Sequence, residues 1–260
     1  MGKVIAVANQ KGGVGKTTTC VSLCSALTEA GAKVLLCDMD PQSNATSGMG
    51  VNKNKTAHNM YSVLIDGVDI NNAIQKTPYG DLLPSGSVMA GAGVELVSID
   101  AREYVLRDVL SKVRDKYDYI FIDCPPSLEM LTLNSLCASN SVLIPVQCEY
   151  FALEGLTDLM RTIELTKKSL NPSLEIEGVV LTMFDSRTNL SAQIAVRIKK
   201  HFKEKTYGIA IPRSIRLAEA PSHGKPIMVY DRSSRGAKSY QELAKEFLKR
   251  NKHNIGGNVR

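Results

Sequence analysis

The stretch that decides the fold is Gln10-Lys11-Gly12-Gly13-Val14-Gly15-Lys16-Thr17-Thr18. It lies between an apolar run, residues 4–8, and a stretch of helical periodicity, residues 17–30. A strand, a glycine-rich loop and a helix in this order are the context of a phosphate-binding loop. The glycines let backbone N–H groups turn inward around phosphate oxygens, and the helix dipole favours the negative charge. The sequence therefore predicts a phosphate loop here.

The loop departs from the ordinary G-x-x-x-x-G-K-[ST] pattern in two places. Gln10 stands where the first glycine would be, and Lys11 adds a second lysine. This K-G-G-x-G-K-T-T form resembles the deviant Walker A family, which includes the ParA, Soj, MinD and nitrogenase iron-protein ATPases. Lys16 is expected to reach the β- and γ-phosphates, and the Thr17 hydroxyl to ligate Mg²⁺. A tight turn with two solvated lysines is the weaker alternative.

Length and composition place few limits on the protein. The 260 residues fit one large domain or two small ones, and 43% hydrophobic residues support a sizeable core. No apolar run approaches the roughly 20 residues of a membrane span, and the N-terminus shows no signal segment. The six cysteines lie in apolar stretches without a C-x-x-C pair, which predicts reduced, buried thiols in a cytosolic protein.

The charge is distributed unevenly. Residues 186–260 contain 17 Lys and Arg against 5 Asp and Glu, a net charge of +12, whereas residues 1–185 carry −6. Such asymmetry suggests a surface at the C-terminal end that faces a polyanion. A solvated basic face without a ligand is the alternative.

Short apolar runs alternate with longer helical patterns along the chain. The pattern predicts an α/β fold: a mostly parallel, doubly wound sheet with helices on both faces. Residues 43–55 are expected to form a loop and residues 86–93 a flexible connection. The expected helices cover residues 17–30, 58–65, 70–74, 99–116, 150–169, 190–205 and 236–252.

Two acidic residues follow predicted strands. Asp40 comes just after the run 33–37, where open α/β sheets bind ligands, so it is a candidate to orient the attacking water. Asp123 ends a Walker B strand and is expected to hold Mg²⁺, directly or through water. Pro125 and Pro126 follow it and restrict the backbone where the chain leaves this strand, which suits a segment that senses the γ-phosphate. For each aspartate the alternative is a structural role at a strand end.

The resemblance to the Soj/ParA partition ATPases extends over nearly the whole chain. It implies a single ParA-like ATPase domain over residues 1–260, without the N-terminal helix-turn-helix module of some ParA proteins. The matching segments, besides the phosphate loop, are residues 38–42 (DMDPQ), 123–127 (DCPPS), 145–150 (PVQCEY) and 220–227 (APSHGKPI).

The resemblance implies an ATP-dependent sandwich homodimer that hydrolyses ATP slowly with Mg²⁺. In that arrangement Lys11 reaches the nucleotide of the other subunit, and Asp40 helps to position the hydrolytic water. Lys11, Lys16 and Asp40 are then the catalytic residues, and Thr17 and Asp123 hold the metal. The residues implied at the nucleotide are Lys11, Gly12, Gly13, Val14, Gly15, Lys16, Thr17, Thr18, Pro212 and Arg213.

Family members of this kind bind DNA without sequence preference, and a ParB-type centromere-binding protein stimulates hydrolysis and release. The matching DNA-binding positions are Arg187 and Arg216, both in the basic third of the chain. An ion pair with Glu219 is the alternative for Arg216. The implied location is the cytoplasm, associated with the nucleoid.

Three other classes fit the sequence less well. A MinD-like membrane-associated ATPase needs an amphipathic C-terminal anchor, but residues 251–260 hold few aliphatic side chains. A metal-cluster reductase needs paired thiolates, for which Cys124 and Cys137 are the candidates, although both suit core packing better. A GTPase needs an N-K-x-D motif, and residues 52–55 lack the final aspartate.

Overall fold

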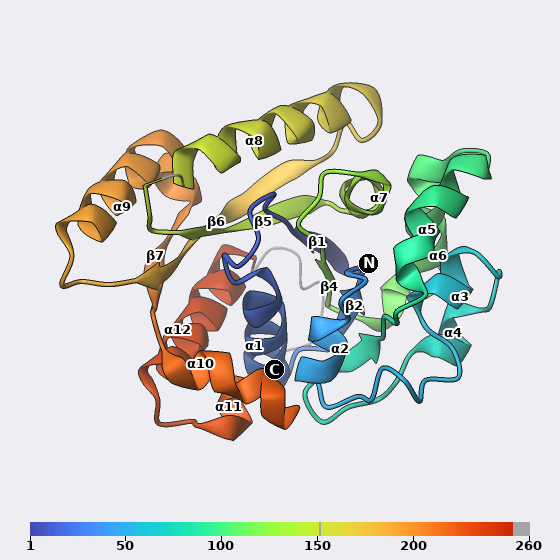
Figure 1. Cartoon of the computed structure of the whole chain (residues 1–260), viewed down its shortest axis with the longest axis horizontal. Helices are drawn as coiled ribbons and strands as arrows, with labels where there is room; N and C mark the ends of the chain where they lie inside the picture. Colours follow the sequence, from blue (N-terminus) through green and yellow to red (C-terminus); the bar gives the residue numbers. More distant parts are fainter. Residues whose placement is uncertain (151, 252–260) are drawn as a thin grey trace.

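The computed structural model describes residues 1–150 and 152–251. Within them, seven strands form one sheet in the order β3-β2-β4-β1-β5-β6-β7, and every neighbouring pair is parallel. The sheet runs through the middle of the molecule (Figure 1). The strands are β1 (Lys3–Val7), β2 (Val34–Asp38), β3 (Asp81–Leu83), β4 (Tyr119–Asp123), β5 (Ser141–Gln147), β6 (Glu175–Phe184) and β7 (Thr206–Pro212).

Side chains of the central strand β1 alternate between two hydrophobic cores. Val4 and Ala6 belong to one core, and Ile5 and Val7 belong to the other. None of the four exposes more than 1% of its surface. A parallel sheet covered on both faces buries both sets of side chains, so its central strands are apolar at successive positions. This explains why the run before the phosphate loop shows no polar alternation.

Helices cover both faces of the sheet, which confirms the predicted fold class. Helices α1 and α12 pack in the core of Ile5, whereas α8 and α9 pack in the core of Val4 (Figure 1). The α-helices are α1 (Lys16–Glu29), α2 (Asn44–Gly48), α3 (Met60–Leu64), α4 (Ile70–Ala73), α5 (Met89–Glu95), α6 (Val105–Ser111), α7 (Met130–Ala138), α8 (Ala152–Ser169), α9 (Asn189–Phe202), α10 (Ile215–Glu219), α11 (Ile227–Tyr230) and α12 (Arg235–Arg250). The 3₁₀ helices are η1 (Leu96–Ser98), η2 (Arg102–Tyr104), η3 (Arg114–Lys116), η4 (Lys203–Lys205) and η5 (Ala220–His223).

The single helix predicted over residues 99–116 is wrong. The structure forms η2, α6 and η3 in this segment instead. Ala101 has a φ of 52°, in the left-handed region, so no helix can run through it. The apolar side of the pattern is still used, because Leu106 and Leu110 are buried.

Two segments that were predicted to be irregular contain helices. In the segment 86–93, which was expected to be a flexible connection, Met89 and Ala92 are fully buried and begin α5. In the expected loop 43–55, α2 forms around Thr46, whose side chain and backbone both donate to Asp38. The burial of Met89 and Ala92, and the hydrogen bonds of Thr46, outweigh weak local propensity in these two places.

The terminal helix α12 docks on the sheet, as its pattern predicts. Tyr240, Leu243 and Phe247 are buried, and the Phe247 ring centroid lies 5.0 Å from that of Tyr119. Residues 252–260, the last part of the segment judged a poor membrane anchor, lie outside the described residues. No described helix has the length and apolar character needed to cross a bilayer.

The six cysteines are all buried and unbridged, which confirms the prediction of buried, unpaired thiols. They are Cys20, Cys24, Cys37, Cys124, Cys137 and Cys148.

Candidate functional site

The loops that follow the strands' carboxyl ends meet at one edge of the sheet, because the strands are parallel. Strand β1 lies between β4 and β5, so the phosphate loop emerges beside the loops that follow those two strands. Parallel α/β sheets bind their ligands at this edge. The candidate site is therefore built from the ends of β1, β2, β4 and β5.

The phosphate loop has the backbone that its glycines permit. Gly13 and Gly15 have φ values of 73° and 89°, which side chains other than glycine rarely adopt. A Cβ atom at Gly12 or Gly13 would meet nothing within 4 Å. Open space therefore lies in front of this part of the loop, just before α1 begins at Lys16. This arrangement fits a phosphate group at the N-terminus of α1.

Two polar side chains that the sequence interpretation missed hold the loop in place. Asn9 accepts from the Lys11 amide at 3.0 Å and donates to the Pro145 carbonyl at 2.7 Å. Thr182 donates to the Val14 carbonyl at 2.8 Å. Asn9, two residues before Lys11, has a typical spacing for such a turn, but no local pattern marks Thr182, which lies 168 residues away from Val14.

Lys16 lies inside the loop. It exposes only 7% of its surface, and its Nζ donates to the Lys11 carbonyl at 3.2 Å. Burial lowers the pKa of Lys16, while the nearby Asp123 carboxylate opposes that shift. A buried ammonium beside empty space and an N-terminal helix end is suited to a bound phosphate.

Thr17 and Asp123 form the candidate metal site. The Thr17 hydroxyl donates to Asp123 Oδ2 at 2.7 Å, and the Cys20 thiol lies 3.5 Å from Oδ1. Burial raises the pKa of Asp123, and the neighbouring Asp38 carboxylate raises it further. Two buried carboxylates on adjacent strands gain from a cation between them and the phosphates, so these residues fit Mg²⁺.

Asp38 organises the segment that contains Asp40. Its carboxylate accepts from the Thr46 amide at 2.8 Å, the Thr46 hydroxyl at 2.7 Å and the Asp40 amide at 3.1 Å. The Asp40 carboxylate accepts from the Gln42 amide at 2.9 Å and is 8% exposed. The Ser85 hydroxyl donates to the Asp40 carbonyl at 2.9 Å. Asp40 thus lies at the edge of the sheet where ligands bind. Hydrogen bonds with Asp38 and Ser85 hold its backbone in place.

The Lys11 side chain makes its contact outside the phosphate loop. Its ammonium pairs with the Glu149 carboxylate in the connection between β5 and α8, and about a third of each side chain is exposed. The two lysines of the loop therefore have different environments. Lys16 is buried in the loop, whereas Lys11 lies where a neighbouring molecule could reach it.

Pro212 and Arg213 line a cavity of about 320 Å³ beside the start of α1. Gly15 and Thr18 contribute its wall on the side of the phosphate loop, and the other lining residues come mainly from β6, β7 and α10. The lining is mostly apolar, as a planar base requires. The residues that line it are Gly15, Thr18, Thr182, Met183, Ile211, Pro212, Arg213, Ser214, Ile215, Leu217, Ala218 and Tyr240.

Comparison with known proteins identifies the family. A family model described as an AAA domain matches residues 2–176. The chain is 54% identical to the sporulation initiation inhibitor protein Soj of Bacillus subtilis, over 95% of this chain and 98% of that protein. It is 48% identical to the chromosome partitioning protein ParA of Myxococcus xanthus, over 96% and 89%. The chain belongs to the Soj/ParA family of partition ATPases.

A solved structure supports the nucleotide site of this Soj/ParA chain. It is described as cobyrinic acid a,c-diamide synthase from Mycobacterium smegmatis, with a bound ATP analogue and magnesium. The two chains are 36% identical, with a TM-score of 0.86 and full coverage of both. Its name refers to another reaction, but two relatives at higher identity are named as a chromosome partitioning protein and a chromosome-partitioning ATPase.

The two arginines predicted to bind DNA lie on the surface, and each is paired within the chain. Arg187 contacts Asp185 through Nε and Nη2 at 2.9 and 2.8 Å, which lowers the pKa of Asp185. Arg216 pairs with Glu219 at 3.0 Å and with Asp231 at 3.4 Å. The structural alternative for Arg216 is thus present, but these exposed pairs are weak enough to exchange for phosphates.

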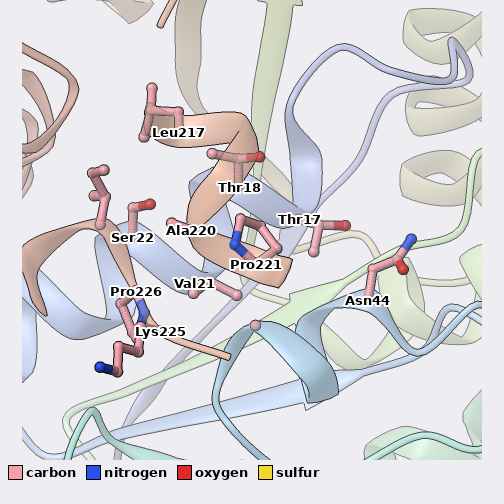
Figure 2. A pocket seen from close by; sticks show the side chains of 12 residues that line it. Thr17, Thr18, Val21, Ser22, Asn44, Leu217, Ala220, Pro221, Lys225 and Pro226 are labelled. Carbon is pink, nitrogen blue, oxygen red and sulfur yellow. The ribbon is translucent and has the colours of Figure 1, made fainter. Parts of the chain in front are cut away.

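A small pocket shows how the segment around Arg216 reaches the phosphate loop. Thr17 and Thr18 line it from α1, Asn44 from α2, Leu217 from α10 and Pro221 from η5 (Figure 2). Its volume of about 20 Å³ is enough for one water molecule, so it is a packing contact between elements. Segments that follow Asp40 and Arg216 therefore pack against the same turn of α1.

Proposed function

We propose that this Soj/ParA chain forms an ATP-dependent homodimer that binds DNA without sequence preference and is released on hydrolysis. A ParB-type centromere-binding protein and DNA would stimulate that hydrolysis, and the cycle would segregate a chromosome or plasmid. In this proposal residues 1–260 act as one ATPase domain in the cytoplasm, associated with the nucleoid. Membership of the partition ATPase family supports the role in partition and ATP hydrolysis.

The observation that carries the proposal is the separation of Lys11 from Lys16. Lys16 lies within its own loop, whereas Lys11 leaves it and pairs with Glu149 at the surface. One lysine can therefore serve the chain's own nucleotide while the other reaches a second copy. Two subunits that each present a triphosphate repel, and a lysine donated across the interface turns that repulsion into an attractive contact.

Several residues of the chain would have separate roles in ATP hydrolysis. Backbone N–H groups of residues 12–16 would bind the phosphates, and Lys16 would neutralise charge on the β- and γ-phosphates. Thr17 and Asp123 would hold Mg²⁺, which supplies charge stabilisation to the leaving phosphate. Asp40 would orient the attacking water. Lys11 of the partner copy would add a positive charge at the γ-phosphate. Pro212 and Arg213 would pack near the adenine.

Loss of the γ-phosphate would then release the dimer, because Lys11 loses the charge that it contacts. The basic surface with Arg187 and Arg216 would bind DNA phosphates best when two copies present it together. Phosphate contacts carry little sequence information, so binding would be non-specific and steeply dependent on salt.

No stable association with membranes is part of this proposal. A MinD-like role would use an amphipathic C-terminal helix at the lipid surface. Here the apolar side of α12 is occupied by the sheet, with Tyr240, Leu243 and Phe247 buried.

Co-sedimentation with plasmid DNA and, in parallel, with anionic liposomes tests the proposed function. We expect binding to DNA that requires ATP and Mg²⁺, falls as salt is raised, and is lost in Lys11→Ala. Binding to liposomes but not to DNA would instead favour the membrane-associated alternative. DNA binding that is the same without nucleotide would contradict the proposal.

A further inference from the structure

Glu149 is an acidic residue at the ligand edge to which the proposed function gives no role. It follows β5, and β5 pairs with β1, so the Glu149 segment and the phosphate loop leave the sheet side by side. Its carboxylate pairs with the Lys11 ammonium, and the two side chains are 35% and 33% exposed. The Lys11 ammonium is therefore paired with a carboxylate of its own chain, and this ion pair is partly exposed to solvent.

The structure also fixes the direction in which Lys11 leaves the loop. Its amide donates to Asn9 Oδ1 at 3.0 Å, and its carbonyl accepts from Lys16 Nζ at 3.2 Å. A Cβ atom at Gly155 would lie 3.9 Å from Lys11 Cβ, so the first turn of α8 lies close to the base of the side chain. Hydrogen bonds hold the Lys11 backbone at both its amide and its carbonyl. From this position the Lys11 side chain can reach the Glu149 segment.

We propose that Glu149 is a positioning residue that holds Lys11 within the single chain and competes with the phosphates of a partner copy. This inference rests on the proposed function, in which Lys11 reaches across the dimer. To do so, its ammonium must exchange the Glu149 carboxylate for the partner's nucleotide. Glu149 thus sets the protein concentration at which the dimer forms.

The competition also distinguishes ATP from ADP. A triphosphate offers Lys11 more negative charge than a diphosphate, whereas the Glu149 carboxylate is the same in both cases. Lys11 therefore exchanges the Glu149 carboxylate for the phosphates of ATP more readily than for those of ADP. Removing the carboxylate should lower the concentration needed for dimerisation by the same factor with either nucleotide, because the lost ion pair is the same, and so it should bring the weaker ADP dimer closer to a detectable level.

The test is sedimentation of Glu149→Gln with Mg-ATP and with Mg-ADP over a range of protein concentrations. We expect the ATP dimer to form at about 3–5-fold lower concentration than in the wild type, the effect of a partly exposed ion pair. A dimer with ADP should also become detectable, and the difference should shrink at 0.5 M salt. Glu164→Gln is the matched control, because Glu164 is an exposed glutamate on α8, and it should behave as the wild type.

A second measurement separates this inference from the proposed function. In the nucleotide-free monomer, a lysine-reactive ester followed by mass spectrometry should modify Lys11 faster in Glu149→Gln, because the ammonium is no longer held. In the double variant Lys11→Ala/Glu149→Gln, the gain in dimerisation should disappear.

The outcomes are distinct. If Lys11→Ala abolishes the dimer but Glu149→Gln dimerises no better than the wild type, this inference is wrong and the proposed function stands. Unchanged labelling of Lys11 in Glu149→Gln overturns it as well. If Lys11→Ala dimerises with ATP like the wild type, both the proposed function and this inference fall.

Discussion

The Thr17 hydroxyl donates a hydrogen bond of 2.7 Å to Asp123 Oδ2, and so joins the first turn of α1 to the end of β4. The two residues are 106 positions apart in the chain. Asp123 is fully buried next to Asp38 on the neighbouring strand, and burial raises the pKa of both carboxyl groups. The site therefore holds negative charge that is costly without a cation.

This charge makes the stability of the nucleotide-free protein depend on pH. Because both pKa values are raised on folding, the folded state holds protons more tightly than the unfolded state, so stability falls as pH rises above about 4 through the raised values. Asp123→Asn should stabilise the nucleotide-free protein by about 1–2 kcal/mol at pH 8 and by less at pH 5. It should also abolish the stabilisation by Mg-ATP.

Chemical denaturation at the two pH values, with and without Mg-ATP, checks this prediction. Asp100→Asn is the control, because Asp100 is exposed, and it should have the wild-type stability at both pH values. An Asp123→Asn protein that is less stable than the wild type at pH 8 would contradict the view that the buried charge is costly.

Asp40→Ala should separate dimerisation from hydrolysis. Asp40 contributes its carboxylate at the ligand edge, while Asp38 and Ser85 hold the segment through their own contacts. Removing the carboxylate should lower single-turnover phosphate release by about 10²-fold or more and leave the ATP dimer intact. Asp40→Asn keeps the shape of the side chain and should be equally inactive. Near-normal phosphate release by either variant would remove Asp40 from the catalytic residues.

Arg216→Ala should reduce the salt dependence of DNA binding. If each subunit of a dimer loses one phosphate contact, the slope of log K against log salt should fall in magnitude by roughly 2. Arg187→Ala should act in the same way. Lys168→Ala is a suitable control, because Lys168 is exposed on α8, across the sheet from α10. A slope that changes equally in the control would mean that only net charge matters.

The sequence predicts the parts of the site that depend on local chemistry. The glycine loop, Lys16, Thr17 and the strand-end Asp123 lie together as expected, because a phosphate loop and a Walker B strand are short motifs on neighbouring parallel strands. The assignment of Pro212 and Arg213 to the base, and of Arg187 and Arg216 to DNA, stays a prediction.

Contacts between distant segments were beyond the reach of the sequence. Thr182 supports the phosphate loop from β6, and Thr46 fixes Asp38 through a helix in a segment of low helical propensity. The partner of Lys11 was also missed, since Glu149 is 138 residues away in a segment that was cited only as a family match. Thr182 and Glu149 acquire their roles from strand order, which no local pattern specifies, whereas Thr46 acts through a short helix only eight residues after Asp38.

The central claim is that the nucleotide joins two copies of the chain through Lys11. Light scattering on purified protein with Mg-ATP tests it most directly. We expect the wild type to rise from 28.3 kDa towards twice that mass, and Lys11→Ala to stay monomeric while it binds ATP within a few-fold of the wild-type affinity. A wild-type mass that is the same with and without ATP, or a Lys11→Ala protein that dimerises equally well, would contradict the account.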